Sequence, residues 1–312
     1  MRLRDLLDQR YAVLKDLDAK TVKKHHYTLD RFRDFLADTS PGRDPEPTLS
    51  DLEDLTVMRF LRWRAERVHH GKKPSAATIK KDRACILALA TFAAKKRMKP
   101  AGSSEPVEFL VLPSRPGVVQ IPVAYTVEEV QRLIVLAGTR EGTAGGQPAG
   151  WFWQTLIYSA WCTGERIGAL LGLRWADVDT EARLITFRAA TRKGHARDIQ
   201  RAITPDLAQQ LQTHRKGDGD LVWDWCCDRD YFSLWPSMRY LCRRCGIRIT
   251  GFHALRKASA SYITAAGGNA QEHLGHSSPA VTRDHYLDPR ITGRQSGLEF
   301  LPKLDLGGSK PS

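Results

Sequence analysis

The stretch from Gly251 to Tyr286 constrains this chain more than any other part of it. It opens with an amphipathic pattern that predicts a helix, and Gly267-Gly268 ends that helix. The positions that share one face lie three or four residues apart: Phe252, Leu255, Ser259, Tyr262, Ile263 and Ala266. His253 and Arg256 are neighbours on the same helix, because side chains three positions apart point the same way. Any fold of this chain must therefore present an imidazole beside a guanidinium.

The polar residues of this stretch suit chemistry at a phosphate. A guanidinium offers parallel N–H donors to phosphate oxygens and never loses its charge. Leu274-Gly275-His276 follows the helix, and Tyr286 comes ten residues after His276. A Tyr hydroxyl is a weak nucleophile at its ordinary pKa of about 10, so it needs cations and a base around it. Each residue alone is usually a packing or solvated residue, and only their order indicates a site.

A second group of polar residues lies upstream. Thr163-Gly164 forms a break before a short helix whose first turn carries Arg166. Residues 184–188 and 197–204 have the composition of two strands, joined through a turn at Gly194 with Lys193 at its tip. The sequence therefore predicts a second guanidinium and an ammonium group on separate elements.

These motifs resemble those of the tyrosine recombinases of the phage-integrase family. The resemblance is strong over about residues 122 to 290, through T-G-x-R, a Lys-Gly turn, H-x-x-R, L-G-H and a downstream Tyr. It implies one catalytic site made of six residues: Arg166, Lys193, His253, Arg256, His276 and Tyr286. It also implies a mainly α fold with a small antiparallel β-hairpin or sheet (α+β), in which an N-terminal helical DNA-binding bundle precedes the catalytic domain.

The resemblance implies a mechanism as well. Tyr286 would attack a DNA phosphorus and leave a 3′-phosphotyrosine and a free 5′-hydroxyl. Arg166, Arg256 and His276 would donate to the non-bridging oxygens. His253 would accept the Tyr proton or orient the phosphate, and Lys193 would protonate the leaving oxygen. Because cationic side chains neutralise the phosphate, no metal, nucleotide or other cofactor is expected. The expected partner is double-stranded DNA, with a tetramer on paired sites and a monomer or weak oligomer in the free state.

The chain departs from the family pattern at three places. A Glu commonly sits three residues after the first Arg, and Ala169 stands there instead. Lys257 follows the second Arg, where a His is often found. The link from Gly267 to Leu274 is shorter than usual, which bears on how His276 is presented. These departures keep open a second function, a catalytically impaired DNA-binding protein of the same fold. A topoisomerase-like nicking and closing enzyme is disfavoured, because nothing marks the further domains it would carry.

Length and charge agree with two domains that bind a polyanion. The chain has 312 residues, a formal net charge of +13 and a pI near 9.6. A generic basic soluble protein would share this composition, but nucleic acid is the usual partner. Met1 is followed by charged residues, and no apolar run approaches the ~20 residues that a membrane span requires. We therefore expect a cytoplasmic location.

Residues 1–118 are expected to form a helical, DNA-clamping domain, with linker composition from about residue 100, and residues 119–312 a catalytic domain with a tail from about 291. Ser50 to Glu53 reads as a capping box, and Ser75 as the cap of a helix from Ala76 to Lys96. Between Lys72 and Lys99 lie nine basic residues and one acid, Asp82. A solvated face would normally mix its signs, so DNA contact is expected at Lys72, Lys73, Lys80, Lys81, Arg83, Lys95, Lys96 and Arg97.

Four of the six cysteines invite a comparison with zinc sites. Cys226-Cys227 precedes Cys242-x-x-Cys245. One C-x-x-C motif with a vicinal pair is not the doubled C-x-x-C of a zinc ribbon, so buried thiols are the expected state and a metal is the alternative.

Overall fold

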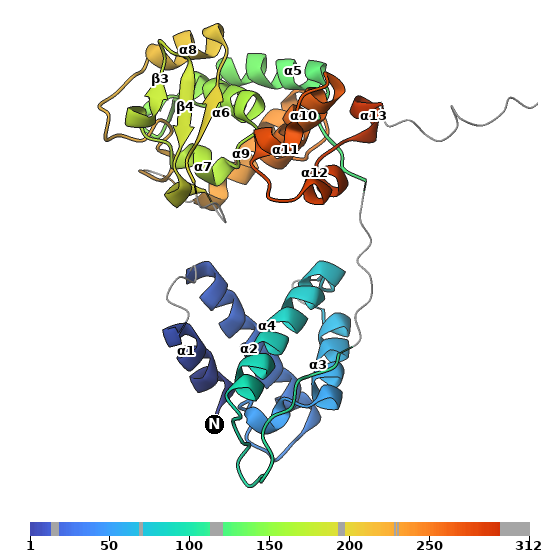
Figure 1. Ribbon diagram of the computed structural model, residues 1–312. Coiled ribbons are helices and arrows are strands. Elements are labelled where there is room, and N and C mark those ends of the chain that lie inside the picture. The colour runs from blue at the N-terminus through green and yellow to red at the C-terminus, as the bar shows by residue number, and fades with distance from the viewer. Residues whose placement is uncertain are drawn as a thin grey trace, which may run out of the picture. The chain divides into compact units, whose positions relative to one another are not determined.

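The computed structural model describes residues 1–13, 19–68, 71–112, 121–192, 197–227, 229 and 231–293. The chain divides into two compact units, Met1–Pro116 and Gly117–Ser312, each with its own hydrophobic core (Figure 1). Helices dominate both units, and the second also holds small antiparallel sheets, which confirms the predicted fold class. Among the described residues, no helix combines the length and the apolar character needed to cross a membrane.

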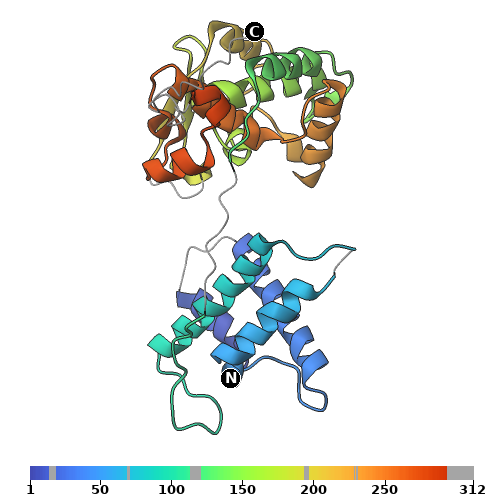
Figure 2. The same ribbon diagram turned by 90° about the vertical axis from the view of Figure 1, so that its right-hand side faces the viewer.

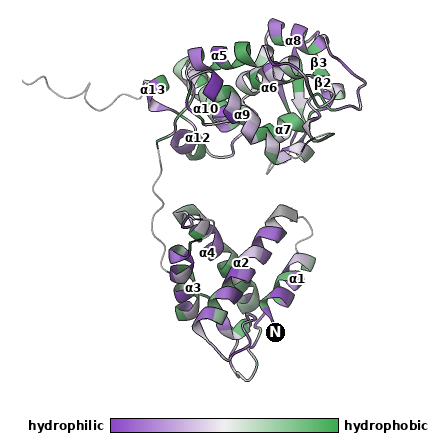
Figure 3. Cartoon of the chain, turned by 180° about the vertical axis from the view of Figure 1, so that it is seen from behind, coloured by the Kyte–Doolittle hydropathy of each residue, from purple (hydrophilic) through white to green (hydrophobic). Residues whose placement is uncertain are grey.

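The described part of the first unit is a bundle in which one helix touches all the others. Its α-helices are α1 (Leu3–Val13), α2 (Ala19–Thr39), α3 (Asp54–Glu66) and α4 (Ala76–Lys95). Helix α4 packs against α1, α2 and α3 (Figures 1 and 2). Phe32, Phe35 and Phe60 pack in the core, with the Phe32 and Phe60 ring centroids 4.7 Å apart. The bundle helices carry hydrophilic and hydrophobic residues side by side, as helices packed on one face do (Figure 3).

Helix starts in this unit follow local capping, with one correction. Ser75 caps α4 as predicted, since its hydroxyl accepts from the Thr78 amide at 3.2 Å. The predicted box from Ser50 to Glu53 is wrong. The buried carboxylate of Asp51 instead accepts a hydrogen bond from the Thr48 amide at 2.8 Å. It also accepts one from Arg43 at 2.6 Å. This arrangement stabilises a 3₁₀ turn at Leu49–Asp51, so α3 begins only at Asp54.

Residues 101–112 belong to the bundle, although their composition suggested a linker from about residue 100. Val107 and Leu112 are buried in the core of the first unit. The Val107 amide donates to the Met98 carbonyl at 2.8 Å, and the Val111 amide donates to Asp54 at 2.9 Å. Pro and Gly therefore mark turns here, and apolar side chains between them fasten the segment. Residues 113–120 lie outside the described residues.

The second unit is organised around α6 (Ala149–Thr163), an apolar helix that is buried along most of its length. The remaining helices are α5 (Val127–Gly138), α7 (Ile167–Leu171), α8 (Pro205–Gln212), α9 (Leu234–Arg244), α10 (Phe252–Ala265), α11 (Ala270–Leu274), α12 (Pro279–His285) and α13 (Pro289–Thr292). Helices α5 and α10 both pack on α6. A helix without a polar face must be covered on all sides, which explains this central position.

Two small sheets complete the second unit. Strands β1 (Thr143–Ala144) and β2 (Gln147–Pro148) form one, and β3 (Val178–Asp179), β4 (Leu184–Phe187) and β5 (Ile199–Ala202) form the other in that order. The two predicted strands are confirmed as β4 and β5, which pair antiparallel with Phe187 opposite Ile199. Strand β3 was not predicted, because two residues are too short for a periodic pattern. Lys193 and the predicted turn at Gly194 lie outside the described residues.

Helices α10 to α13 gather at one end of this unit, away from β3 and β4 (Figure 1). Helix α10 packs against α11 and α13. The described chain ends just after α13, so most of the tail predicted from about residue 291 lies outside it.

Candidate active site

The junction of α6 and α7 delivers Arg166. Helix α6 ends at Gly164, whose φ of 61° is left-handed. A Cβ at Gly164 would stand 2.6 Å from His273 Nε2, so both the conformation and the space require Gly. The chain turns there, and Arg166 becomes the residue that precedes α7, half-buried at the edge of the core. The predicted break is present, but Arg166 stands at the N-cap of α7 and not in its first turn, where the sequence had predicted it.

Helix α10 delivers His253 and Arg256 from its first two turns. Arg256 is 1% exposed and donates to the carbonyls of Gly164 and Leu274, the latter at 3.0 Å. Burial lowers the pKa of Arg256 to about 10, although the charge of Glu165 acts to raise it. The guanidinium is therefore charged at neutral pH and is held by two carbonyl oxygens from separate elements.

His276 is locked in one orientation by its two ring nitrogens. Helix α11 ends at Gly275 in the left-handed region, and the chain then turns His276 back toward Arg256. His276 Nε2 lies 3.0 Å from an Arg256 nitrogen, and Nδ1 lies 2.9 Å from the Thr282 hydroxyl. Because a guanidinium can only donate, Nε2 must accept, and Nδ1 carries the proton in the neutral ring. The short link before α11 thus still presents His276 to Arg256, with Asn269 capping α11.

Tyr286 lies among these groups in the same chain. It follows α12, is 8% exposed, and its ring centroid is 4.5 Å from that of His276 and 5.2 Å from that of His253. The central carbon of the Arg256 guanidinium lies 5.4 Å from the Tyr286 ring centroid. The phenol is therefore packed by two imidazoles and a guanidinium, the groups that the sequence assigned to it.

The backbone around Tyr286 is also fixed. The Ser261 hydroxyl, from α10, donates to the Tyr286 carbonyl at 3.3 Å and accepts from the Asp288 amide at 2.8 Å. The buried carboxylate of Asp288 accepts from the Ala124 amide at 2.8 Å and from Arg290. Nothing in the sequence motifs pointed to Ser261 or Asp288, because neither carries out chemistry; they hold the segment that carries Tyr286.

His253 is the base candidate, and its electrostatic setting is cationic. Partial burial, with the charges of Lys257, Arg256 and Arg166, lowers the pKa of His253 to about 4. The ring keeps an exposed edge, so it is neutral and accessible at neutral pH. Arg166 is close enough for its charge to act on both His253 and Arg256. Five of the six predicted residues thus share one region, and the sixth, Lys193, lies outside the described residues.

Sequence reasoning missed three groups in this region: the buried Glu165 and Arg192, and the half-buried His273. Glu165 and Arg192 form an ion pair at 2.9 Å in which both side chains are 1% exposed. His273 Nε2 lies 2.8 Å from the Ser259 hydroxyl, and burial lowers the pKa of His273 to about 4. Glu165, which directly follows the Thr163-Gly164 break, was a sequence signal for the first pair. The family pattern instead has its carboxylate at the position of Ala169. Ala169 itself is buried in the core.

The cysteines are placed as separate thiols. Cys242 is buried, with its sulfur 3.3 Å from the Tyr125 hydroxyl, while Cys226 and Cys227 are exposed. Within the described ranges, no three His, Cys, Asp or Glu side chains gather in a way that could hold a metal ion.

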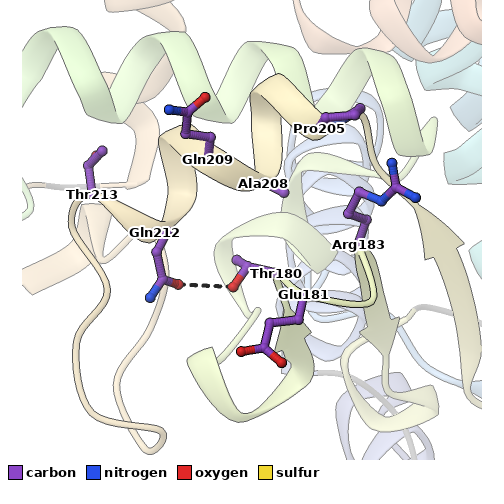
Figure 4. A pocket seen from close by; sticks show the side chains of 8 residues that line it. All are labelled: Thr180, Glu181, Arg183, Pro205, Ala208, Gln209, Gln212 and Thr213. Carbon is purple, nitrogen blue, oxygen red and sulfur yellow. Dashed lines mark hydrogen bonds between the residues drawn. The ribbon is translucent and has the colours of Figure 1, made fainter.

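The surface hollow drawn in Figure 4 offers no comparable chemistry. It lies between the β3–β4 turn and α8, has a volume of about 590 Å³, and is crossed by a 2.9 Å hydrogen bond from Thr180 to Gln212. Its charged lining groups are Glu181 and Arg183, and its lining includes no Tyr, His, Ser or Cys.

Most of the basic residues between Lys72 and Lys99 fall into two exposed groups. Lys72, Lys73, Lys80 and Lys81 lie before and in the first turns of α4, whereas Lys95, Lys96 and Arg97 lie at its end. From Lys80 to Lys95 the helix rises by roughly 22 Å. Asp82, the one acid of this stretch, is buried against Arg64 at 3.3 Å, so its negative charge does not offset the positive charge of the surface. Arg83 differs from the others, because it donates to the Leu112 carbonyl and fastens residues 101–112.

A sequence model described as the phage integrase family matches residues 125–291, which is more than half of the chain. The chain belongs to the phage integrase family. The matched segment contains all six residues predicted for the site. A search of curated proteins found no match for this family member.

Several solved structures share the fold of this integrase-family chain. XerH site-specific recombinase bound to palindromic difH substrate, in a post-cleavage complex, is 18% identical with a TM-score of 0.68, covering 90% of this chain and 80% of that one. A lambda integrase tetramer bound to a Holliday junction is 17% identical with a TM-score of 0.62, covering 95% and 79%. The Tn1549 transposon integrase in complex with transposon right end DNA is 15% identical with a TM-score of 0.62, covering 94% and 98%. At these identities the likeness concerns the fold.

Proposed function

We propose that this protein is a site-specific DNA recombinase that cleaves and rejoins DNA through a 3′-phosphotyrosine on Tyr286. The observation that carries the proposal is the packing of the Tyr286 ring against His276, His253 and the Arg256 guanidinium within one chain. A buried phenol ringed by cations and imidazoles is an unusual packing residue, and it is a suitable nucleophile for a phosphodiester. Membership of the phage integrase family supports the same reading.

In the proposed reaction the Tyr286 oxygen attacks the phosphorus. A P–O bond to Tyr286 forms and the P–O5′ bond breaks, so the number of phosphate esters is unchanged and rejoining needs no ATP. Arg256 and Arg166 stabilise the negative charge that develops on the non-bridging oxygens, and His276 donates beside them from Nε2 in its doubly protonated form, with Nδ1–H still on Thr282. The neutral ring of His253 accepts the Tyr proton or orients the phosphate. Lys193 gives a proton to the 5′ oxygen.

DNA is the proposed partner, and both units take part. The exposed cations at the two ends of α4 are the proposed phosphate contacts of the first unit: Lys72, Lys73, Lys80, Lys81, Lys95, Lys96 and Arg97. Lysine and arginine contacts to phosphate fix position without reading sequence, so they supply affinity. We propose a tetramer on paired sites and a monomer or weak oligomer without DNA, in the cytoplasm. Light scattering of the protein with and without a two-site duplex measures both states.

Covalent trapping on randomised DNA tests the proposal. A pool of duplexes with a randomised centre and staggered nicks is incubated with the protein, so that a cleaved fragment diffuses away and the adduct persists. We expect a DNA adduct that survives denaturant and is lost in Tyr286→Phe, while binding is kept. Tyr240→Phe is the matched control, because Tyr240 is 50% exposed and lies outside the site. Sequencing the trapped DNA also identifies the preferred site.

Two outcomes would overturn the proposal in different ways. An adduct that persists in Tyr286→Phe would exclude Tyr286 as the nucleophile. Binding without any adduct from the unmodified protein would instead support the alternative, a DNA-binding protein of this fold that does not cleave. Ala169 is the observation that keeps this alternative in play, since no carboxylate stands at that position.

A further inference from the structure

Glu165 is a buried carboxylate shared between groups from three parts of the site. One oxygen lies 2.9 Å from an Arg192 nitrogen, and the other lies 3.9 Å from an Arg256 nitrogen. The second oxygen also accepts from the Arg166 amide at 3.3 Å. The side chains of Glu165, Arg192 and Arg256 are each 1% exposed. Water therefore cannot screen these three charges, so the electrostatic energy of each group depends on the other two.

Two buried guanidiniums, those of Arg192 and Arg256, lie at unequal distances from this carboxylate, and the charge of the half-buried Arg201 also acts on it. Arg192 donates a charge-assisted hydrogen bond to Glu165, whereas Arg256 stands beyond hydrogen-bond distance of the same carboxylate. Among the described residues, the Nε atoms of Arg192 and Arg256 are buried without a hydrogen-bond partner. Glu165 is therefore committed mainly to Arg192. Arg256, bonded to neutral carbonyls and to His276, keeps most of its charge available for a phosphate.

We infer that Glu165 and Arg192 form a positioning pair for Arg256. Glu165 keeps Arg192 from repelling Arg256, and Arg192 keeps Glu165 from bonding directly to Arg256 and neutralising it. Neither residue of the pair touches DNA; both act through the Arg256 guanidinium. The inference rests on the proposed function for its meaning in catalysis, but the charge balance itself is a property of the folded protein.

The pair predicts an unusual pattern of single and double variants. In Arg192→Gln, Glu165 becomes free to close on Arg256, and we expect cleavage to fall by about tenfold or more. In Glu165→Gln, the unpaired charge of Arg192 displaces Arg256, and we expect a loss of similar size. In the double variant Glu165→Gln/Arg192→Gln, two neutral amides face each other and the net charge around Arg256 is the same as in the unmodified protein, so cleavage returns to within about threefold of the unmodified protein.

The test measures cleavage of a duplex selected from the random pool, its affinity in the Tyr286→Phe background, and the melting temperature of every variant. Glu181→Gln is the control for loss of an exposed carboxylate, and it should change none of these values. Methylphosphonates replace single phosphates around the cleavage position. A deficit that acts through Arg256 should shrink when the attacked phosphate loses its charge, whereas a folding defect should persist on both substrates.

The outcomes separate this inference from the proposed function. If the unmodified protein forms no adduct, the proposed function fails, and the affinity cycle alone decides the inference. Recovery in the double variant supports the pair. A double variant as impaired as the weaker single variant, or a single variant with normal cleavage and affinity, would overturn it. If a single variant fails to fold, cleavage by the double variant is compared with cleavage by the unmodified protein, on charged and on neutral phosphates. That comparison still decides the inference.

Discussion

Replacing Thr282 by Val tests whether the orientation of His276 matters to the chemistry. The Thr282 hydroxyl lies 2.9 Å from His276 Nδ1 and is 4% exposed. Valine has nearly the same shape as threonine, so it removes the hydroxyl with little change in packing. In this variant the proton of His276 can stay on Nδ1, which then has no acceptor. Alternatively the proton moves to Nε2, where it would point at the Arg256 N–H donor.

The size of the effect follows from the burial of this contact. Leaving a buried donor without its partner costs about 1–3 kcal/mol. At about 1.4 kcal/mol per tenfold, this corresponds to a cleavage rate lowered by roughly 5-fold to 150-fold, if the whole cost falls on the transition state. We expect a value near the lower end, because the ring is half-buried and a water molecule can reach one side of it.

Single-turnover cleavage of the trapped substrate measures the rate, and thermal unfolding reports stability separately. Thr282→Ser is the matched control, since it keeps the hydroxyl and loses only a methyl group. The reasoning predicts that Thr282→Ser cleaves near the normal rate while Thr282→Val does not. If the two variants cleave within about twofold of each other, the hydrogen bond has no role in catalysis, and the tautomer assigned to His276 carries no functional meaning.

Three further predictions concern stability and DNA binding. Gly164→Ala should destabilise the second unit by at least about 1 kcal/mol in chemical denaturation, because alanine is strained in the left-handed region and its Cβ would meet His273. The pKa values of His253 and His273 are lowered in the folded state to about 4, so the unfolded chain binds more protons between pH 6.5 and 4; stability should fall as the pH falls through that window, and less so in His273→Asn. Replacing Lys95, Lys96 and Arg97 by Ala should flatten the salt dependence of DNA binding by about 0.9 per lost phosphate contact, whereas Arg83→Ala should mainly lower stability, since Arg83 binds the Leu112 carbonyl.

Sequence motifs correctly predicted a helix cap that depends only on residues close together in the chain. The cap at Ser75 works through a residue three positions away, so it could be predicted without the fold, and it is present. The box at Ser50 failed for the opposite reason. Arg43, eight residues before Asp51, contributes to the charge balance there, and no local pattern reveals which acid a distant arginine will select.

The same distinction separates the two layers of the candidate site. Arg256, His276 and Tyr286 could be proposed because their motifs resemble the family pattern and their chemical types suit a phosphate. Glu165 could not, because its role depends on Arg192 arriving from beyond β4, and its value as a partner comes from the absence of water around both groups. The family pattern has a carboxylate at position 169, and this chain instead buries one four residues earlier, 3.9 Å from Arg256. The physical need is for a negative charge near Arg256 that stops short of neutralising it, and a fold can meet that need from more than one position.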